Sequence, residues 1–323
     1  MTAHAVVSDG LVRRFGESNV VDGIDLVIST GEIYGFLGPN GAGKSTMVRM
    51  LTTLLLPTAG TATVAGYDVV HEPHEVRLRI GAALQEASLD SRQTGRELLR
   101  LQGSLYGLSR REIDRRMVDL EQLVDIGDAM DRLVGTYSGG MKRRLDLAAA
   151  LVHNPQVLFL DEPTTGLDPI SRVKVWEEVR RINKDLGVTI LLLTQYLEEA
   201  DALTNRIGII NRGRLVAEGT PTELKRSVGS DVIIAQIDGD SIAATEALGR
   251  ITNIGAIETH GGELTIAIEN GAAFVSRVAL ALNDAGVAVR ELTLRSPTLD
   301  DVFLHFTGAR LEEAETAPEE SEE

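Results

Sequence analysis

The sequence has no cysteine and no long hydrophobic run. Without cysteine there can be no disulfide bond, thiolate metal site or thiol nucleophile, and this composition fits a cytoplasmic protein. No apolar run approaches the roughly 18 to 20 residues that a membrane-spanning helix requires. The N-terminus also lacks the basic and then apolar segment of a secretory signal. If this protein acts at a membrane, we expect another chain to cross it.

Basic residues are scarce, since 32 Lys and Arg stand against 48 Asp and Glu, for a net charge of −16. The acidic excess is concentrated at the end of the chain, where residues 311–323 hold seven Glu and no basic residue. Such a block favours a solvated, disordered tail over residues 309–323, with an interaction tail as the alternative. Because nothing resembles a basic face, we do not expect nucleic acid as a partner.

Glycine, in contrast, is frequent, and the stretch GPNGAGKST at 38–46 fits the pattern G-x-x-x-x-G-K-[ST]. In this pattern the glycines let backbone N–H groups close around phosphate oxygens. Lys44 supplies a cation to the outer phosphates, and the hydroxyl of Ser45 can bind Mg²⁺. An apolar run precedes the stretch and a helical pattern follows it, which is the strand, loop, helix order of a phosphate site. The expected nucleotide contacts are Gly38, Pro39, Asn40, Gly41, Ala42, Gly43, Lys44, Ser45 and Thr46.

A second candidate stretch is YSGGM at 137–141, which opens a helical pattern that continues to Val152. Ser138, Gly139 and Gly140 at a helix N-terminus make a small anion site, with free N–H groups and a favourable dipole. The same residues also suit a simple N-cap. Taken by themselves they favour the N-cap.

A third stretch is the apolar run 157–160, which ends in Asp161 and Glu162. A continuous apolar strand with acids at its carboxyl end can place a Mg²⁺-directed carboxylate beside bound phosphates. Asp161 would hold the metal, directly or through water. Glu162 would polarise the attacking water, because a carboxylate is a suitable acceptor when the nucleophile loses a proton.

Three single residues also stand where a site would need them. Phe15 lies in a segment otherwise too polar for a core, so its ring could stack on a base, with an ordinary packing role as the alternative. Gln85 follows the strand-like run 80–84, where a side chain could reach a metal or a water, although alone it would be a solvated loop residue. Gln195 follows the strand-like run 188–193.

These features stand in one order along the chain: Phe15, the phosphate loop, Gln85, YSGGM, LFLDEP with TTGLD, and the strand ending at Gln195. Over about residues 5–225 this order resembles the ATP-binding subunit of ABC transporters. The resemblance implies a P-loop ABC ATPase domain with a mixed α/β sheet core, an antiparallel β lead-in and an inserted helical subdomain at about 88–136. In that subdomain a helical stripe of Ile113, Met117, Leu120 and Val124 favours a core face over a partner surface.

In that family YSGG is the signature sequence, which closes on the ATP held by the phosphate loop of a second copy packed head to tail. The resemblance therefore overturns the preference for a simple N-cap. It implies ATP and Mg²⁺ as cofactors and the following residues: Glu162, Gln195 and Lys44 for catalysis; Ser45, Gln85 and Asp161 for Mg²⁺; Phe15, the phosphate loop, Ser138, Gly139, Gly140 and Asp168 for the nucleotide.

One position departs from the family pattern, because members usually have His where this chain has Gln195. Gln can donate and accept hydrogen bonds but has no titratable charge. The wording TQYLEEAD, together with SPTLDDVFLHFTG near the C-terminus, is similar to the daunorubicin/doxorubicin-resistance subgroup of drug exporters. Gln195 is thus interpreted as a trait of that subgroup.

Beyond Ser227 the composition changes, and the expected order of elements is β-α-β-β-α-β, followed by a short helix. This order predicts a small α+β ferredoxin-like domain. We therefore expect an ABC ATP-binding domain at 1–228, an accessory domain at 229–308 and an acidic tail at 309–323. The accessory domain is expected to have a regulatory or dimer-contact role, and a passive packing module is the alternative.

The resulting hypothesis is an ATPase subunit that powers an ABC exporter of drugs or other hydrophobic compounds. It would work as a homodimer with a separate transmembrane permease, at the cytoplasmic face of the cell membrane. The alternatives are an exporter of lipid or glycolipid, a soluble ABC-type ATPase without a transporter, and a nucleotide switch that does not hydrolyse ATP.

Overall fold

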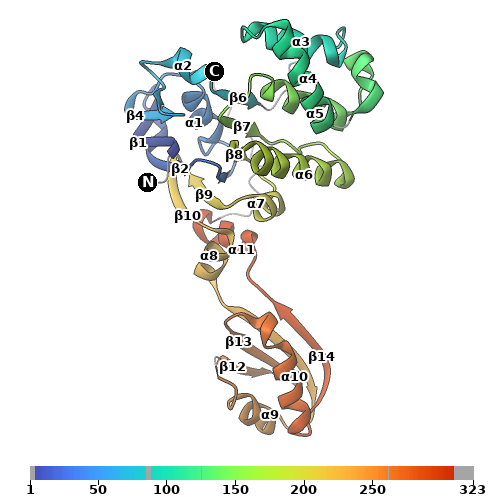
Figure 1. Ribbon diagram of the computed structural model, residues 1–323. Helices are drawn as coiled ribbons and strands as arrows, with labels where there is room; N and C mark the ends of the chain where they lie inside the picture. Colours follow the sequence, from blue (N-terminus) through green and yellow to red (C-terminus); the bar gives the residue numbers. More distant parts are fainter. Residues whose placement is uncertain (1–3, 85–88, 125, 253, 261, 309–323) are drawn as a thin grey trace. The chain divides into compact units, whose positions relative to one another are not determined.

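The computed structural model describes residues 4–84, 89–124, 126–252, 254–260 and 262–308 (Figure 1). Contacts divide the chain into two compact units, one formed by residues up to Pro221 and from Phe306, the other by Thr222–His305. Among the helices of the described residues, none combines the length and the apolar character needed to span a membrane.

The first unit is built on a six-stranded sheet in the order β10-β9-β3-β8-β7-β6 (Figure 1). Neighbouring strands run parallel except at one edge, where β10 pairs antiparallel with β9. Every residue of β3, β7 and β8 is buried, as continuous apolar runs predict for parallel strands covered on both faces. The strands are β3 (Ile33–Leu37), β6 (Ile80–Ala83), β7 (Val157–Asp161), β8 (Thr189–Leu193), β9 (Arg206–Asn211) and β10 (Arg214–Gly219).

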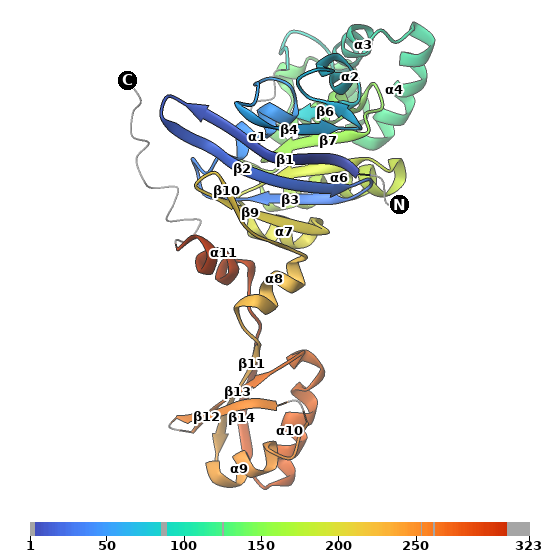
Figure 2. The same ribbon diagram turned by 90° about the vertical axis from the view of Figure 1, so that its left-hand side faces the viewer.

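A second, antiparallel sheet forms the lead-in, in the order β2-β1-β4-β5 (Figure 2). Its strands are β1 (His4–Phe15), β2 (Ser18–Ser29), β4 (Ala59–Val64) and β5 (Tyr67–Asp68). The sequence predicts a strand from Ala5 to Ser8 that ends at the turn signal Asp9-Gly10, and this prediction covers only the first part of β1. Gly10, at φ +54°, accompanies a shift of the pairing register between Ser8 and Leu11 and thus marks a β-bulge, after which β1 continues to Phe15. Asp-Gly is here a bulge signal and not a turn.

Helices of the first unit cover the sheets and supply the predicted helical subdomain. They are α1 (Lys44–Leu51), α2 (Pro73–Arg77), α3 (Gly95–Leu105), α4 (Arg110–Val124), the 3₁₀ turns η1 (Gly127–Asp131) and η2 (Val134–Thr136), α5 (Gly139–Leu151), α6 (Pro169–Leu186) and α7 (Leu197–Leu203). In α4 the predicted stripe residues Ile113, Met117 and Leu120 are at most 4% exposed. They belong to the core, as expected from their spacing.

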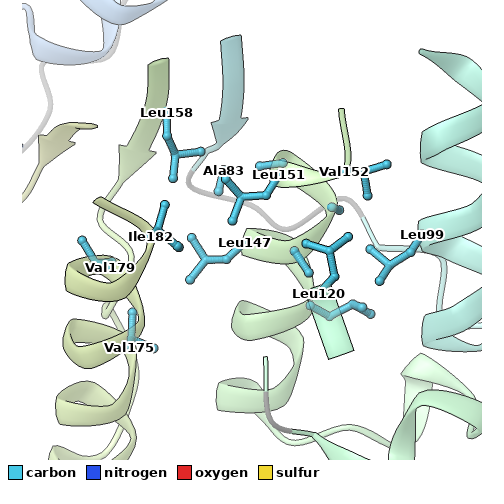
Figure 3. Close-up of a cluster of buried hydrophobic side chains, with 14 of the residues drawn as sticks. Ala83, Leu99, Leu120, Leu147, Leu151, Val152, Leu158, Val175, Val179 and Ile182 are labelled. Atoms are coloured by element: carbon cyan, nitrogen blue, oxygen red, sulfur yellow. The ribbon is translucent and has the colours of Figure 1, made fainter. Parts of the chain in front are cut away.

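Helix α5 lies at the centre of one hydrophobic cluster. Figure 3 shows Leu147 and Leu151 of α5 between Val179 of α6 on one side and Leu120 of α4 on the other. This continuous packing joins the helical subdomain to the parallel sheet. A second cluster lies on the opposite side of the parallel strands and contains side chains of β1, β2, β3 and α1.

The sequence predicts a packing face for this helix at residues 173, 176, 179 and 182, and the structure of α6 differs at one position. Val173 is 48% exposed, whereas Val175 is 1% exposed and packs with Val179 and Ile182 (Figure 3). After three steps of three residues, the last position lies about 180° around the helix axis from the first. Residues with this spacing therefore do not share a single face. Residues 175, 179 and 182 keep to the i, i+4, i+7 pattern.

The second unit has a four-stranded antiparallel sheet in the order β12-β13-β11-β14 (Figure 2). Strand β13 lies between β11 and β12, and β11 lies between β13 and β14, so each βαβ unit is split by a strand of the other. Helices α9 and α10 pack on one sheet face, where Ile233, Ala235 and Ile237 are buried. The bounds are β11 (Asp231–Asp238), α9 (Ser241–Leu248), β12 (Ile254–His260), β13 (Glu263–Ile268), η3 (Gly271–Ala273), α10 (Val275–Asp284) and β14 (Ala288–Arg295). The division assigns the first residue of α8 (Pro221–Val228) and the last two residues of α11 (Leu299–Thr307) to the first unit.

Candidate functional site

The phosphate loop joins the buried strand β3 to α1, so its backbone is held at both ends. Lys44 begins α1 and is 7% exposed. Its ammonium Nζ donates to the carbonyl oxygens of Gly38 at 2.5 Å and Pro39 at 3.0 Å. Burial lowers the pKa of Lys44, and the nearby carboxylates of Glu162 and Asp161 oppose that shift. Neighbouring negative charge thus helps to keep the ammonium protonated in a buried place.

Two glycines let the loop pack closely on neighbouring strands. A Cβ on Gly38 would lie 2.5 Å from the carbonyl oxygen of Ile210, in β9. Gly43 has φ +104°, and a Cβ there would lie 2.4 Å from the carbonyl oxygen of Val20, in β2. Backbone atoms of β9 and β2 occupy the space that a Cβ would need at these two positions. Glycine therefore lets the phosphate loop pack directly against both strands. Ser45, the next residue after Lys44, is exposed and accessible to a ligand.

The acidic pair follows at the carboxyl end of β7. Asp161 is the last residue of that strand and is 8% exposed. Burial raises its pKa, the charge of Glu162 raises it further, and Lys44 opposes the shift. Two adjacent carboxylates in a partly buried place repel each other, so a cation beside them would be stabilising.

Glu162 has an unusual backbone conformation for its type, at φ +49°. A non-glycine residue in the left-handed region is strained, and the following Pro163 restricts it further. The conformation is held by a hydrogen bond from the Glu162 N–H to the Leu193 carbonyl oxygen at 2.8 Å. The hydroxyl of Thr165 also donates to Glu162 Oε2 at 3.1 Å. Strain that the surroundings maintain in this way is typical of functional sites.

Gln195 follows β8, the strand between β3 and β7. Since the carboxyl ends of parallel strands meet at one edge, the sheet brings Gln195 to the same edge as the phosphate loop and Asp161. Its side chain is half-buried. The adjoining turn is fixed by a hydrogen bond from the Tyr196 N–H to Thr194 Oγ1 at 2.9 Å.

The signature stretch begins α5 and so comes from a helix terminus. Ser138 is the N-cap, and its Oγ accepts from the N–H of Met141 at 3.3 Å. The N-cap geometry preferred from the residues alone is thus present, and Ser138 and Gly139 are also exposed. A Cβ on Gly140 would lie 3.3 Å from Ser171 Oγ, so this terminus packs beside the start of α6.

Asp168 caps α6. Its carboxylate accepts from the N–H of Ile170 at 3.1 Å, from the N–H of Ser171 at 3.0 Å and from the Ser171 hydroxyl at 2.6 Å. The hydroxyl contact is the main reason that the pKa of Asp168 is lowered. Two helix N-termini, those of α5 and α6, therefore lie side by side, and each favours negative charge nearby.

Phe15, at the end of β1, is 46% exposed. The guanidinium of Arg13 lies 4.5 Å from its ring centroid. A half-exposed ring with a cation on one face remains available for stacking on a flat ligand. Gln85, the remaining predicted metal ligand, lies outside the described residues.

Two buried charged residues of this region were missed from the sequence. Arg143 of α5, 8% exposed, donates to the carbonyl oxygens of Asp161 and Pro163. Glu199 of α7, fully buried, accepts from Thr164 Oγ1 and Trp176 Nε1, each at 2.9 Å, and burial raises its pKa. The available signal was spacing. Arg143 precedes the buried Leu147 by four residues, and Glu199 precedes the buried Leu203 by four.

Comparisons with protein families give two matches along this chain. A family model described as ABC transporter matches residues 21–165. Another, described as ATP-binding protein DrrA1-3-like, C-terminal domain, matches residues 219–307.

Curated relatives match nearly the whole chain. The daunorubicin resistance ATP-binding protein DrrA3 of Streptomyces coeruleorubidus is 46% identical over 309 residues, covering 95% of this chain and 97% of the relative. The daunorubicin/doxorubicin resistance ATP-binding protein DrrA of Streptomyces peucetius is 46% identical over 332 residues, covering 99% and 97%. A Nod factor export ATP-binding protein I of Ralstonia nicotianae is 36% identical over 304 residues, covering 94% of each chain.

Solved structures match the first part of the fold. The structure of an ATP-binding subunit of an ABC transporter has a TM-score of 0.63 at 29% identity, covering 69% of this chain and 92% of that one. The structure of cbiO1 from Clostridium perfringens, part of the ABC transporter complex cbiONQ, has a TM-score of 0.65 at 26% identity, covering 69% and 90%.

Proposed function

This chain belongs to the ATP-binding subunits of ABC transporters, in the daunorubicin/doxorubicin-resistance group, and we propose that it hydrolyses ATP to power the export of a drug-like hydrophobic compound. The family resemblance and the P-loop ABC ATPase fold inferred from the motifs are confirmed. Relatives named for drug resistance reach 46% identity, against 36% for one named for Nod factor export, which favours a drug as cargo. No comparison supports the soluble, non-transport alternative.

The observation that carries the catalytic proposal is the edge of the parallel sheet where three strands deliver charged and polar residues. The charges of Glu162 and Asp161 both act to raise the pKa of Lys44, so the three groups lie near one another. We assign Lys44 to the outer phosphates, Glu162 to the attacking water and Gln195 to the γ-phosphate and that water. Phosphoryl transfer depends mainly on positioning and charge neutralisation. The strained, hydrogen-bonded backbone of Glu162 supports such a positioned base.

The donor set at this edge fits Mg²⁺. The exposed hydroxyl of Ser45 and the carboxylate of Asp161 are hard oxygen ligands of the kind that Mg²⁺ uses in nucleotide sites. The raised pKa of Asp161, caused by burial and by Glu162, is a second argument, because a divalent cation would offset both effects. When bound, Mg²⁺ would neutralise charge on the phosphates; Gln85 is proposed as its third protein ligand.

The assembly we propose is a head-to-tail homodimer, in which Ser138, Gly139, Gly140 and Asp168 of one copy approach the ATP on the phosphate loop of the other. The N-terminus of α5, exposed at Ser138, supports this arrangement because it favours a phosphate anion, and Asp168 is exposed at the adjacent start of α6. The remaining nucleotide contacts, Phe15 on the base and the phosphate loop on the phosphates, would come from the first copy.

A transmembrane permease is the partner implied by an ATP-binding subunit of an exporter. We propose that it is a separate chain and that it holds this subunit at the cytoplasmic face of the membrane. For the accessory domain, which the sequence predicts at residues 229–308, we propose a regulatory or dimer-contact role, with passive packing as the alternative. Its match to a family of C-terminal domains supports treating it as a module of this group.

The experiment that tests the catalytic proposal is Glu162→Gln. We expect the variant to bind ATP with wild-type affinity and to lose about 10² to 10⁴ in turnover, because the amide cannot accept the proton of the attacking water. Phosphate release and fluorescent-nucleotide binding measure the two quantities separately. Near-normal turnover would refute the role of Glu162. Co-purification with membranes, followed by a drug-stimulated ATPase assay, tests the transport assignment.

A further inference from the structure

The guanidinium of Arg143 makes four contacts in one buried place. It donates to the carbonyl oxygens of Asp161 at 2.8 Å, Pro163 at 3.0 Å and Leu84 at 3.1 Å. It also pairs with the carboxylate of Asp146, one turn along α5, at 3.2 Å. With 8% of Arg143 exposed, these partners replace water almost completely. Few side chains other than Arg can satisfy this many acceptors in fixed directions.

The three carbonyls belong to the backbone on which the proposed chemistry depends. Asp161 and Pro163 flank Glu162, so Arg143 is hydrogen-bonded to the backbone on both sides of the strained residue. Leu84 immediately precedes Gln85, the proposed third ligand of Mg²⁺. One side chain of α5 therefore ties together the carboxyl ends of β6 and β7. All four partners of Arg143 are groups of this chain.

Asp146 extends this connection to the protein surface. It lines a groove of about 590 Å³ together with Leu54, Leu89, Leu101 and Tyr106, which come from other parts of the first unit. Asp146 itself is 14% exposed. The ion pair thus has its carboxylate at the wall of the groove and its guanidinium at the backbone around Glu162.

We propose that Arg143, anchored by Asp146, is a positioning residue for ATP hydrolysis. It fixes the carbonyls on both sides of Glu162, and thereby the place of the base and of the metal-binding carboxylate of Asp161, without touching ATP. The inference rests on the proposed role of Glu162 in hydrolysis. Residues that orient metal-ligating side chains, as Arg143 would orient Asp161, typically contribute about 10-fold to 100-fold in metal affinity or activity.

The test compares Arg143→Lys with a matched control, Arg116→Lys. Arg116 of α4 also donates to backbone carbonyls, those of Leu151 at 2.8 Å and Val152 at 3.2 Å, but these lie at the other end of α5. Lysine keeps the charge and loses the planar fork. We expect R143K to lower kcat at least about 10-fold with KM for ATP within about threefold of wild type. R116K should leave both constants within about twofold.

A second variant guards against misfolding of R143K. Asp146→Asn retains an oxygen acceptor for Arg143 but removes the opposite charge, so the ion pair becomes a weaker hydrogen bond from the guanidinium to a neutral amide. It should therefore lower kcat by at least about threefold, again with KM for ATP little changed. If R143K is not recovered in folded form, D146N decides the question.

The outcomes separate the inference from its premise. A kcat of R143K, or of D146N where R143K does not fold, within about twofold of wild type overturns the inference, provided that Glu162→Gln is inactive. A parallel loss of kcat, ATP affinity and thermal stability also overturns it, since that pattern indicates a structural role alone. If Glu162→Gln stays active, the proposed function itself fails.

Discussion

Ionised Asp146 lowers the free energy of unfolding of the protein, although it anchors Arg143 beside the proposed ATP site. Burial raises its pKa to about 6, although the neighbouring Arg143 acts in the other direction. The native state therefore binds a proton more tightly at this carboxyl than the unfolded chain does. It follows that the free energy of unfolding falls as pH rises from about 4 to about 6, and that the loss is complete above that window.

Replacing Asp146 by Asn removes this titration, and the difference between the two proteins isolates it. The free energy of unfolding of D146N minus that of wild type should increase by about 2 kcal/mol between pH 4 and pH 6, and by about 3 kcal/mol over the whole titration, from a shift of about two units. Urea unfolding at several pH values measures it. A difference independent of pH would show that Asp146 has an ordinary pKa in the native state. Because removing this carboxylate stabilises D146N relative to wild type as pH rises, a lower kcat of D146N at neutral pH could not be attributed to a loss of stability from removing the titrating group.

At the scale of the elements, apolar runs that end in polar residues were sufficient to predict the parallel strands. Strands β7 and β8 lie where the sequence placed them, with Asp161 and Gln195 at their carboxyl ends. Such strands are buried on both faces, so their composition alone is informative. The length of β1 was underestimated because a bulge at Gly10 and a turn have the same local composition.

Buried polar residues were the part of the site that the sequence could not predict. Arg143 lies in a basic run, KRR, that is typical of a solvated helix face, and its acceptors are 18, 20 and 59 residues away. Glu199 likewise lies in a polar run and finds Thr164 35 residues earlier. The spacing of four residues to the buried Leu147 and Leu203 indicates the helix face, but it does not identify the partners that make burial of a charge possible, because the tertiary fold supplies them.

The N-terminus of α5 allows a test that separates capping from ligand binding. Ser and Asp are about equally good N-caps, whereas Ala costs about 1 kcal/mol. Because Ser138 Oγ accepts from the Met141 N–H, Ser138→Ala should destabilise the nucleotide-free protein by about that amount. Ser138→Asp should keep wild-type stability but prevent ATP-driven dimerisation, since its carboxylate would face the phosphates held by the partner.

Two measurements distinguish these outcomes. Thermal unfolding without nucleotide reports on the cap, and sedimentation with ATP in a Glu162→Gln background reports on the dimer. If the Asp variant dimerises as well as the parent, Ser138 is only a cap.

At the scale of the whole molecule, the proposed site belongs to two chains. Lys44 and Glu162 would come from one copy and Ser138 from the other, so a monomer would bind ATP and hydrolyse it poorly. In a head-to-tail dimer each chain contributes one phosphate loop and one signature to different sites. Two variants that are inactive for different reasons can then complete one site between them.

Mixing Lys44→Ala with Ser138→Asp tests this arrangement directly. Each variant alone should be inactive, because every site lacks either the phosphate-binding ammonium or a usable signature. In a mixed dimer the intact signature of the Lys44→Ala chain meets the intact phosphate loop of the other, while the second site carries both defects. Each mixed dimer has one working site against two in a wild-type dimer. If the sites act independently, an equal mixture should therefore recover about one quarter of the wild-type rate per subunit with random pairing, and up to about one half if only mixed dimers form. The control is the double variant mixed with wild type, whose mixed dimers contain no complete site. An equal mixture no faster than the two variants measured separately would contradict a site shared between subunits.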